Sequence, residues 1–152
     1  MHAEGRPRDI PPLWLLVAIL IMLTLHFWLP VGRWLWPPWV HVGWLVLAAA
    51  LWFMVRSVLG FCRAGTGVRP FSPVTALVEN GPFRLSRNPM YVGIVGVAVG
   101  VAICLGTVTP LAVPPLLFVV LDRRFVRREE VFLRQHLGAA YDDYCARVRR
   151  WL

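Results

Sequence analysis

The stretch NGPFRLSRNPMYVG, from Asn80 to Gly93, stands directly before a long apolar run. Asn88 can cap a helix through its side chain, and Pro89 suits the first helical position. The helix that follows is apolar enough to enter a membrane, so its amino end would lie at the water boundary. Backbone N–H groups at that end carry partial positive charge, and Arg84 and Arg87 lie beside it. The stretch therefore predicts either a place for an anionic group, such as a carboxylate or phosphate, or a plain helix cap with juxtamembrane arginines.

The composition indicates a membrane protein with one domain over residues 1–152. Hydrophobic residues make up 58 % of the 152 residues and charged residues only 16 %, which is too apolar for an ordinary soluble domain. All 16 basic residues are arginines, and the net charge is +8. These arginines flank apolar runs, where they would meet anionic lipid headgroups rather than nucleic acid. The three cysteines are far apart and indicate neither a disulfide framework nor a zinc site.

Four apolar runs predict an all-α, polytopic protein with about four transmembrane helices. They cover Leu13–Leu29, Val40–Leu59, Tyr91–Leu105 and Val108–Leu121. The first run could also be a signal peptide, but it is long for one and no small-residue cleavage site follows. The last two runs are short, with a tight break at Gly106-Thr107 between them. They predict a hairpin whose arms are extended by flanking helical turns, with Pro114-Pro115 kinking the returning arm. Gly96-x-x-x-Gly100 permits close helix packing.

The polar segments predict short helices on one side of the membrane. Ser72-Pro73 can start, and Gly81 can stop, a short helix in the 60–87 connection. From Asp122 the chain is basic and amphipathic, Gly138 is a predicted C-cap, and a last helix is expected from about Ala140 to Arg150. This C-terminal part forms the predicted helical cap.

The arginines predict the topology. The amino end holds two, the 60–87 connection four and the tail eight, whereas the loop between the first two runs has only Arg33 and the hairpin tip has none. By the positive-inside rule both termini, the long connection and the cap are cytoplasmic. We expect a multi-pass protein of a bacterial inner membrane.

Glu129 and Glu130 are the acidic candidates for chemistry. They lie about 100° apart on a helix, so only one faces a given pocket. Glu129 shares an apolar face with Phe125, Phe132 and Leu133, whereas Glu130 lies on the side of Val126, Arg127 and Arg134 and is the expected arginine partner, in an exposed ion pair. A carboxylate here could bind ribose hydroxyls or an ammonium; the alternative is pairing with arginines on a solvated face. The sequence shows no metal cluster and no Gly-rich phosphate loop.

Taken together, these motifs resemble a known family. Leu77-Val78-x-x-Gly-Pro-Phe83-Arg-x-x-Arg-Asn88-Pro89-x-Tyr91-x-Gly93 is followed by the hairpin, by Glu129-Glu130-x-x-Leu133 and by Gly138-x-x-Tyr141-x-x-Tyr144. The pattern over residues 66–152 resembles the integral membrane methyltransferases of the isoprenylcysteine carboxyl methyltransferase and phospholipid N-methyltransferase group. Residues 1–59, with the first two helices, carry almost none of it.

The resemblance implies S-adenosyl-L-methionine as methyl donor and a lipophilic small molecule or lipid as acceptor. It also implies that the cofactor pocket is lined by Leu77, Val78, Phe83, Asn88, Pro89, Met90, Tyr91 and Glu129, with Glu130 completing the paired glutamates. An aromatic face such as that of Phe83 or Tyr91 can hold the sulfonium.

The chain departs from the family pattern at the start of the third helix. Asn88-Pro89 stands where carboxyl methyltransferases usually carry His-Pro, which favours an acceptor other than a prenylcysteine. The acceptor atom, a carboxyl, amine or thiol, stays open. Two alternatives to a methyltransferase are an NADPH-dependent membrane reductase of the steroid-reductase type and a small membrane scaffold without a cofactor.

Overall fold

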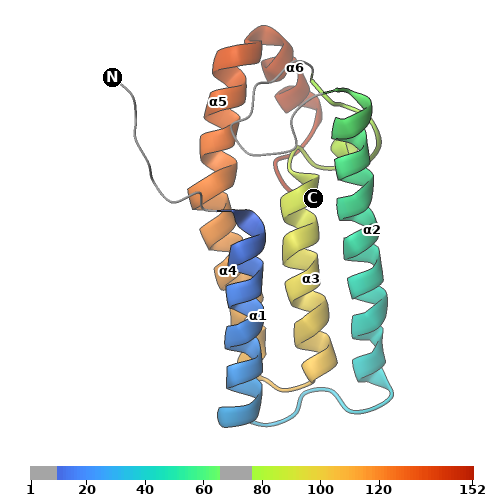
Figure 1. The fold of residues 1–152 in the computed structure, drawn as a ribbon, viewed down its shortest axis with the longest axis vertical. Helices are drawn as coiled ribbons and strands as arrows, with labels where there is room; N and C mark the ends of the chain where they lie inside the picture. Colours follow the sequence, from blue (N-terminus) through green and yellow to red (C-terminus); the bar gives the residue numbers. More distant parts are fainter. Residues whose placement is uncertain (1–9, 66–76) are drawn as a thin grey trace.

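The computed structural model describes residues 10–65 and 77–152, and in this part of the chain helices joined by loops form the fold, with no β-strand (Figure 1). The long helices are α1 (Pro11–Trp28), α2 (Val42–Arg63) and α3 (Pro89–Leu105). The helix α4 (Val113–Leu121) continues through a π-helical turn, η4 (Asp122–Val126), into α5 (Arg127–Leu137), and α6 (Ala139–Arg147) follows. Short 3-10 helices are η1 (Trp39–His41), η2 (Gly81–Arg84) and η3 (Thr109–Ala112). The predicted all-α class is confirmed.

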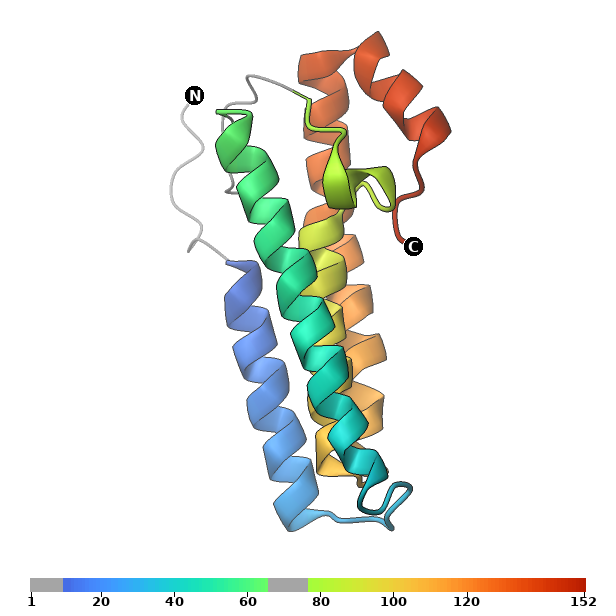
Figure 2. The same ribbon diagram turned by 90° about the vertical axis from the view of Figure 1, so that its right-hand side faces the viewer.

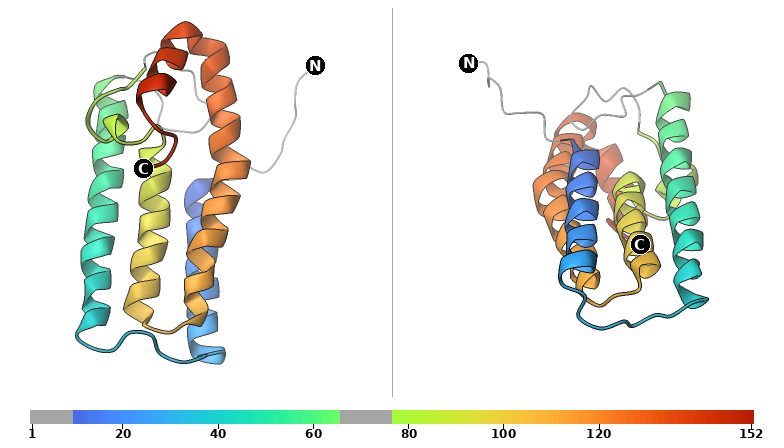
Figure 3. Two further views of the ribbon diagram at one scale, coloured as in Figure 1. Left: turned by 180° about the vertical axis from the view of Figure 1, so that it is seen from behind. Right: turned by 60° about the horizontal axis from the view of Figure 1, so that its bottom comes forward.

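The helices α1 to α4 lie side by side, and α3 is the central one. It contacts α1, α2 and α4, and successive helices run in opposite directions (Figure 2). The helices α5 and α6 lie at the end of the bundle at which α2 ends and α3 begins, and the C-terminus returns to the start of α3 (Figure 3). The core is formed by residues from α1, α3 and the α4–η4 helix: Ala18, Met22, Tyr91, Ile94, Ala98, Ala102, Val113, Leu117, Leu121, Phe125 and Val126.

Two helices of the described chain are long and apolar enough to cross a membrane. They are Pro11–Trp28 and the continuous helical segment Trp39–Arg63. Both leave most of their surface exposed, with large side chains such as Leu20, Trp44 and Trp52 more than half accessible. Burial of such a surface in lipid removes it from water, which is the favourable term for an apolar side chain. The loop after α1 carries exposed Trp34 and Trp36, as expected for a membrane–water interface.

Glycines set the distance between α2 and α3, which confirms the close packing predicted from Gly96-x-x-x-Gly100 and identifies α2 as the partner. A Cβ built on Gly96 would lie 2.9 Å from the Ala50 Cβ, and one on Gly100 would lie 2.7 Å from the Leu47 Cγ and 3.1 Å from the Gly43 carbonyl oxygen. Side chains at these positions would therefore push the two helices apart.

We expect Gly96→Val to lower the free energy of unfolding by about 1–3 kcal/mol, because its side chain overpacks the α2–α3 interface. Thermal unfolding in detergent, followed by circular dichroism, measures this. Val99→Ile, on the exposed side of α3, is the control and should unfold with the parent. Equal stability of Gly96→Val and the control would show that α2 and α3 are not closely packed at Gly96.

The helix ends predicted at Gly106 and Gly138 are confirmed, whereas the kink predicted at Pro114-Pro115 is wrong. Gly106 and Gly138 follow α3 and α5 with positive φ values of 66° and 55°, a conformation that glycine adopts without steric cost. Pro114 and Pro115, in contrast, lie in the first turn of α4, after η3, and do not kink the returning arm. Amide groups of a first turn have no intrahelical partner, so prolines there cost little.

The predicted short helix before Gly81 falls largely on residues 66–76, outside the described residues. Its described end, 77–80, is not helical.

Candidate functional site

Tyr91 and Glu129, 38 residues apart, meet where the bundle joins its cap. Tyr91 lies in the first turn of α3, and its hydroxyl donates a 2.9 Å hydrogen bond to Oε2 of Glu129 in the first turn of α5. The ring of Phe125 lies 6.3 Å from the Tyr91 ring, centroid to centroid. A carboxylate and two aromatic rings are thus brought together between α3 and α5.

Glu129 is half-buried, and its environment penalises the charged form. Burial raises the pKa of its carboxyl and so does the charge of Glu130, whereas the hydrogen bond from Tyr91 opposes them; the net shift is upward. Among the described residues, only Tyr91 donates a hydrogen bond to this carboxylate, through Oε2. The remaining oxygen, Oε1, can accept a hydrogen bond from a ligand.

Glu130 has a different role from the one predicted. It is 7 % exposed, and its carboxylate lies between Arg87, with Nη2 3.1 Å from Oε1, and Arg150, with Nη2 2.6 Å and Nε 2.8 Å from Oε2. An arginine partner was expected, but an exposed pair with the arginines of its own helix was wrong. Arg127 pairs instead with Asp122, and Arg134 with Asp142.

Asn88 occupies the N-cap position of α3 but does not cap it through its side chain, contrary to the prediction. Its Nδ2 donates to the backbone carbonyl of Arg150 at 3.2 Å, and its amide N–H donates to Oγ of Ser86. Arg87 is also engaged, because it pairs with Glu130 and donates to the carbonyl of Cys145. The predicted anion place beside Asn88 is therefore not formed by Arg87, while Arg84 is exposed.

Val78 and Phe83 lie against α2 rather than beside Glu129. The Phe83 ring is buried and packs edge-on against Phe61 at 4.9 Å, and both predicted residues approach Gly60. Tyr144 fixes this segment by donating a 2.7 Å hydrogen bond to the Phe83 carbonyl. Of the other predicted residues, Pro89 is fully buried, whereas Leu77 and Met90 are half-buried. The predicted cofactor residues thus lie in two places: Val78 and Phe83 face α2, whereas Tyr91 faces Glu129 on α5.

The residues after α6 belong to this region, and sequence reasoning missed them. α6 ends at Arg147, and Val148 is extended, so the predicted helix to Arg150 was too long. The carbonyl of Arg150 accepts from Ser86 and Asn88, and Trp151 donates from Nε1 to Oδ1 of Asp122 at 3.1 Å. A lone tryptophan after two arginines was the available signal.

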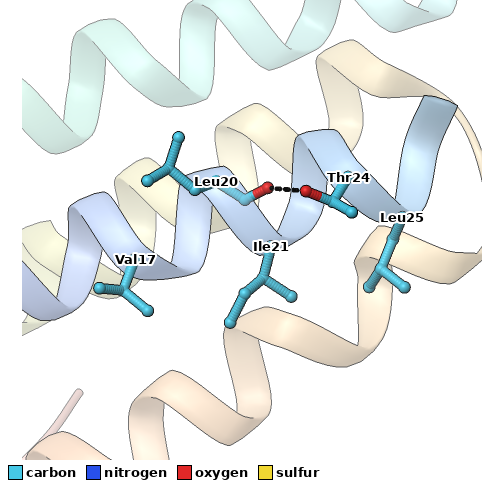
Figure 4. A pocket seen from close by; sticks show the side chains of 5 residues that line it. All are labelled: Val17, Leu20, Ile21, Thr24 and Leu25. Atoms are coloured by element: carbon cyan, nitrogen blue, oxygen red, sulfur yellow. Dashed lines mark hydrogen bonds between the residues drawn. The ribbon is translucent and has the colours of Figure 1, made fainter. Parts of the chain in front are cut away.

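A second surface feature, on α1, carries no titratable group. Val17, Leu20, Ile21, Thr24 and Leu25 line an apolar groove, in which Ile21 and Leu25 point toward α4 (Figure 4). The one polar side chain, Thr24, donates its hydroxyl to the Leu20 carbonyl of its own helix at 2.9 Å. This groove offers no chemistry, and the candidate site remains at Glu129.

Comparison with known protein families gives a match. A family model described as phospholipid methyltransferase matches residues 39–140, from η1 to the first residues of α6. No curated protein matches the chain. The matched range includes Tyr91 and Glu129 but neither α1 nor the tail after α6.

Proposed function

Because the chain belongs to the phospholipid methyltransferase family, we propose that it transfers a methyl group from S-adenosyl-L-methionine to a lipophilic acceptor at the membrane surface. Family membership supports a membrane methyltransferase. The observation that carries the finer proposal is the half-buried Glu129 carboxylate, held by Tyr91 beside the Phe125 ring. These residue types suit a ligand that combines a cation with hydroxyl groups.

The residues at Glu129 fit two parts of this cofactor. A carboxylate can accept hydrogen bonds from ribose hydroxyls or from the ammonium, and charge-assisted bonds of this kind are the strong ones. Tyr91 and Phe125 are only 6 % and 3 % exposed, so a sulfonium, which an aromatic face attracts, would reach their rings only if core side chains move aside on binding. The side chains of Asn88 and Arg87 are engaged with the tail and with Glu130, so we assign them no direct contact with the cofactor carboxylate.

The chain's part in the reaction is alignment. When bound, the cofactor would supply a methyl carbon already activated by a sulfonium, and the chain's residues would hold it in line with the acceptor. Such an in-line displacement needs correct placement and exclusion of water more than an acid–base pair. Glu129 and Tyr91 would hold the donor end, and the apolar helices would present the acceptor from the bilayer.

Topology is part of the proposal. We expect α1 to α4 to cross the membrane, with both termini, the candidate site and the cap of α5 and α6 in the cytoplasm. Eight arginines after Leu121 and the lack of any between 88 and 122 support this orientation. Reporter fusions at Leu152 and within residues 30–39 should report opposite sides. Matching signals from both positions would refute the four-span arrangement.

The pH dependence of binding follows from the raised pKa of Glu129. Only the ionised carboxylate attracts an ammonium, so affinity for S-adenosylhomocysteine should fall with decreasing pH, beginning above the ordinary glutamate range of about 4.3. The contribution of Glu129 to the free energy of unfolding should instead rise as the pH falls. A raised pKa means that the folded state binds the proton more tightly than the unfolded state does. Calorimetric titration across pH measures the affinity. Glu129→Gln should flatten the profile, and an unchanged profile would assign the titration to another group.

Calorimetry with two ligands tests the class of enzyme. The purified protein in detergent should bind S-adenosylhomocysteine and should not bind NADPH. Binding of NADPH alone would favour the membrane reductase, and binding of neither would favour a scaffold without a cofactor.

A further inference from the structure

The tail after α6 lies across the start of α3. Its backbone is extended at Val148, and the C-terminus lies at the start of α3 in the view from behind (Figure 3, left). The backbone amide of Arg87 donates to the carbonyl of Arg149 at 2.9 Å, and the Ser86 hydroxyl donates to the carbonyl of Arg150 at 3.1 Å. The tail is therefore bonded along the segment that leads into α3.

Arg150 joins the two halves of the candidate site. Its backbone carbonyl accepts hydrogen bonds from Ser86 and Asn88, immediately before α3, while its guanidinium pairs through Nε and Nη2 with Glu130 on α5. Both nitrogens of this planar group contact the same carboxylate oxygen, Oε2, so the pair constrains the direction of the guanidinium as well as its distance. One residue thus links the helix of Tyr91 to the helix of Glu129.

The Glu130 contact determines where its neighbour points. Glu129 and Glu130 are adjacent on α5, so a rotation of α5 that loosens Glu130 also turns Glu129 away from the Tyr91 hydroxyl. Arg87 holds the other side of the same Glu130 carboxylate. Glu130 is buried, which keeps water from replacing either arginine.

Trp151 anchors the tail one turn before α5. Its ring lies 4.5 Å from that of Phe118 on α4, centroid to centroid, and its Nε1–H donates to Asp122 in η4. Asp122 is itself buried and also pairs with Arg127. The tail is consequently held at both α4–η4 and α5, and the contacts of Trp151 fix the backbone position of the adjacent Arg150.

We propose that Arg150 is a positioning residue for the cofactor site, which sets the distance and rotation of α5 against α3 so that Glu129 faces Tyr91. The inference rests on the proposed function, because the quantity that Arg150 controls is cofactor affinity. Arg150 itself need not touch the cofactor. If the contact of Arg150 with Glu130 only stabilised the fold, its loss would leave the cofactor affinity of the folded protein unchanged.

The test uses the full chain in detergent and calorimetric titration with S-adenosylhomocysteine, at a temperature where circular dichroism shows every variant folded. Arg150→Gln should bind about tenfold more weakly than the parent, since misplacement of a binding group by a fraction of an ångström to one ångström is costly. Arg150→Lys should fall between them, because lysine keeps the charge but not the planar pair of donors. Arg149→Gln removes the same charge from the adjacent, exposed side chain and should bind within about twofold of the parent, as expected for a surface charge.

The outcomes separate the two hypotheses. Equal affinities of Arg150→Gln and Arg149→Gln would overturn the positioning role. If Arg150→Gln does not fold, Arg150→Lys decides, and parent-like affinity there would overturn it. If the parent does not bind S-adenosylhomocysteine, the proposed function fails, and the positioning role fails with it.

Discussion

Glu130→Gln is expected to lower the free energy of unfolding by about 3 kcal/mol, because removing one partner of a buried ion pair leaves the other charge uncompensated. The side chain of Glu130 is 9 % exposed and that of Arg87 13 %, so water cannot replace the lost carboxylate charge for Arg87. Arg150, at 38 %, can recover part of its hydration. Equilibrium unfolding in mixed detergent micelles measures the loss.

Asp142→Asn is the matched control for this effect. It also neutralises the carboxylate of an arginine pair, but the side chains of Arg134 and Asp142 are 55 % and 56 % exposed. Exposed pairs contribute about 0–1 kcal/mol. If the two variants unfolded alike, the Glu130 network would be no more than a surface contact.

Glu129→Gln should instead reduce binding of S-adenosylhomocysteine about tenfold to a hundredfold and leave stability unchanged or slightly higher. A hydrogen bond to a charged group is worth about 1.5–3 kcal/mol, and each 1.4 kcal/mol corresponds to about tenfold in affinity. Burial already disfavours the ionised form of Glu129, as its raised pKa indicates, so a neutral side chain costs the fold little.

Calorimetry and unfolding measured on the same preparations separate the adjacent glutamates. Tyr91→Phe is the control for orientation: it keeps the ring, removes the donor to Glu129 and should weaken binding less than Glu129→Gln does. Parent-like affinity in Glu129→Gln would remove this carboxylate from the cofactor site.

Features set by nearby sequence were predictable. Helix periodicity placed Glu129 and Phe125 on one face of the helix, and the glycines at 106 and 138 marked helix ends. The separation of Gly96 from Gly100 predicted close helix packing, and the structure identifies α2 as the partner helix. Each of these depends on spacings of a few residues, which a sequence displays directly.

Features set by distant contacts were not predictable. Asn88 has the residue type and position of a helix cap, but its side chain bonds to the carbonyl of Arg150, 62 residues away. Glu130 finds Arg87 and Arg150 rather than arginines on its own helix, because the tail turns back where α6 ends. Every residue has a backbone carbonyl, so a sequence does not show which carbonyl accepts a given hydrogen bond. The contacts of Asn88 and Glu130 with the tail were therefore found only in the structure.

Transfer of labelled methyl groups would show directly whether the protein methylates a lipophilic acceptor. Purified protein is incubated with a membrane lipid extract and S-adenosylmethionine labelled in its methyl group, and the organic phase is then analysed for label. We expect a labelled, lipid-soluble product with the parent and with Asp142→Asn, and a large loss of label with Glu129→Gln. Absence of label from the lipid phase with a folded parent protein that binds S-adenosylhomocysteine would contradict methyl transfer to a lipophilic acceptor.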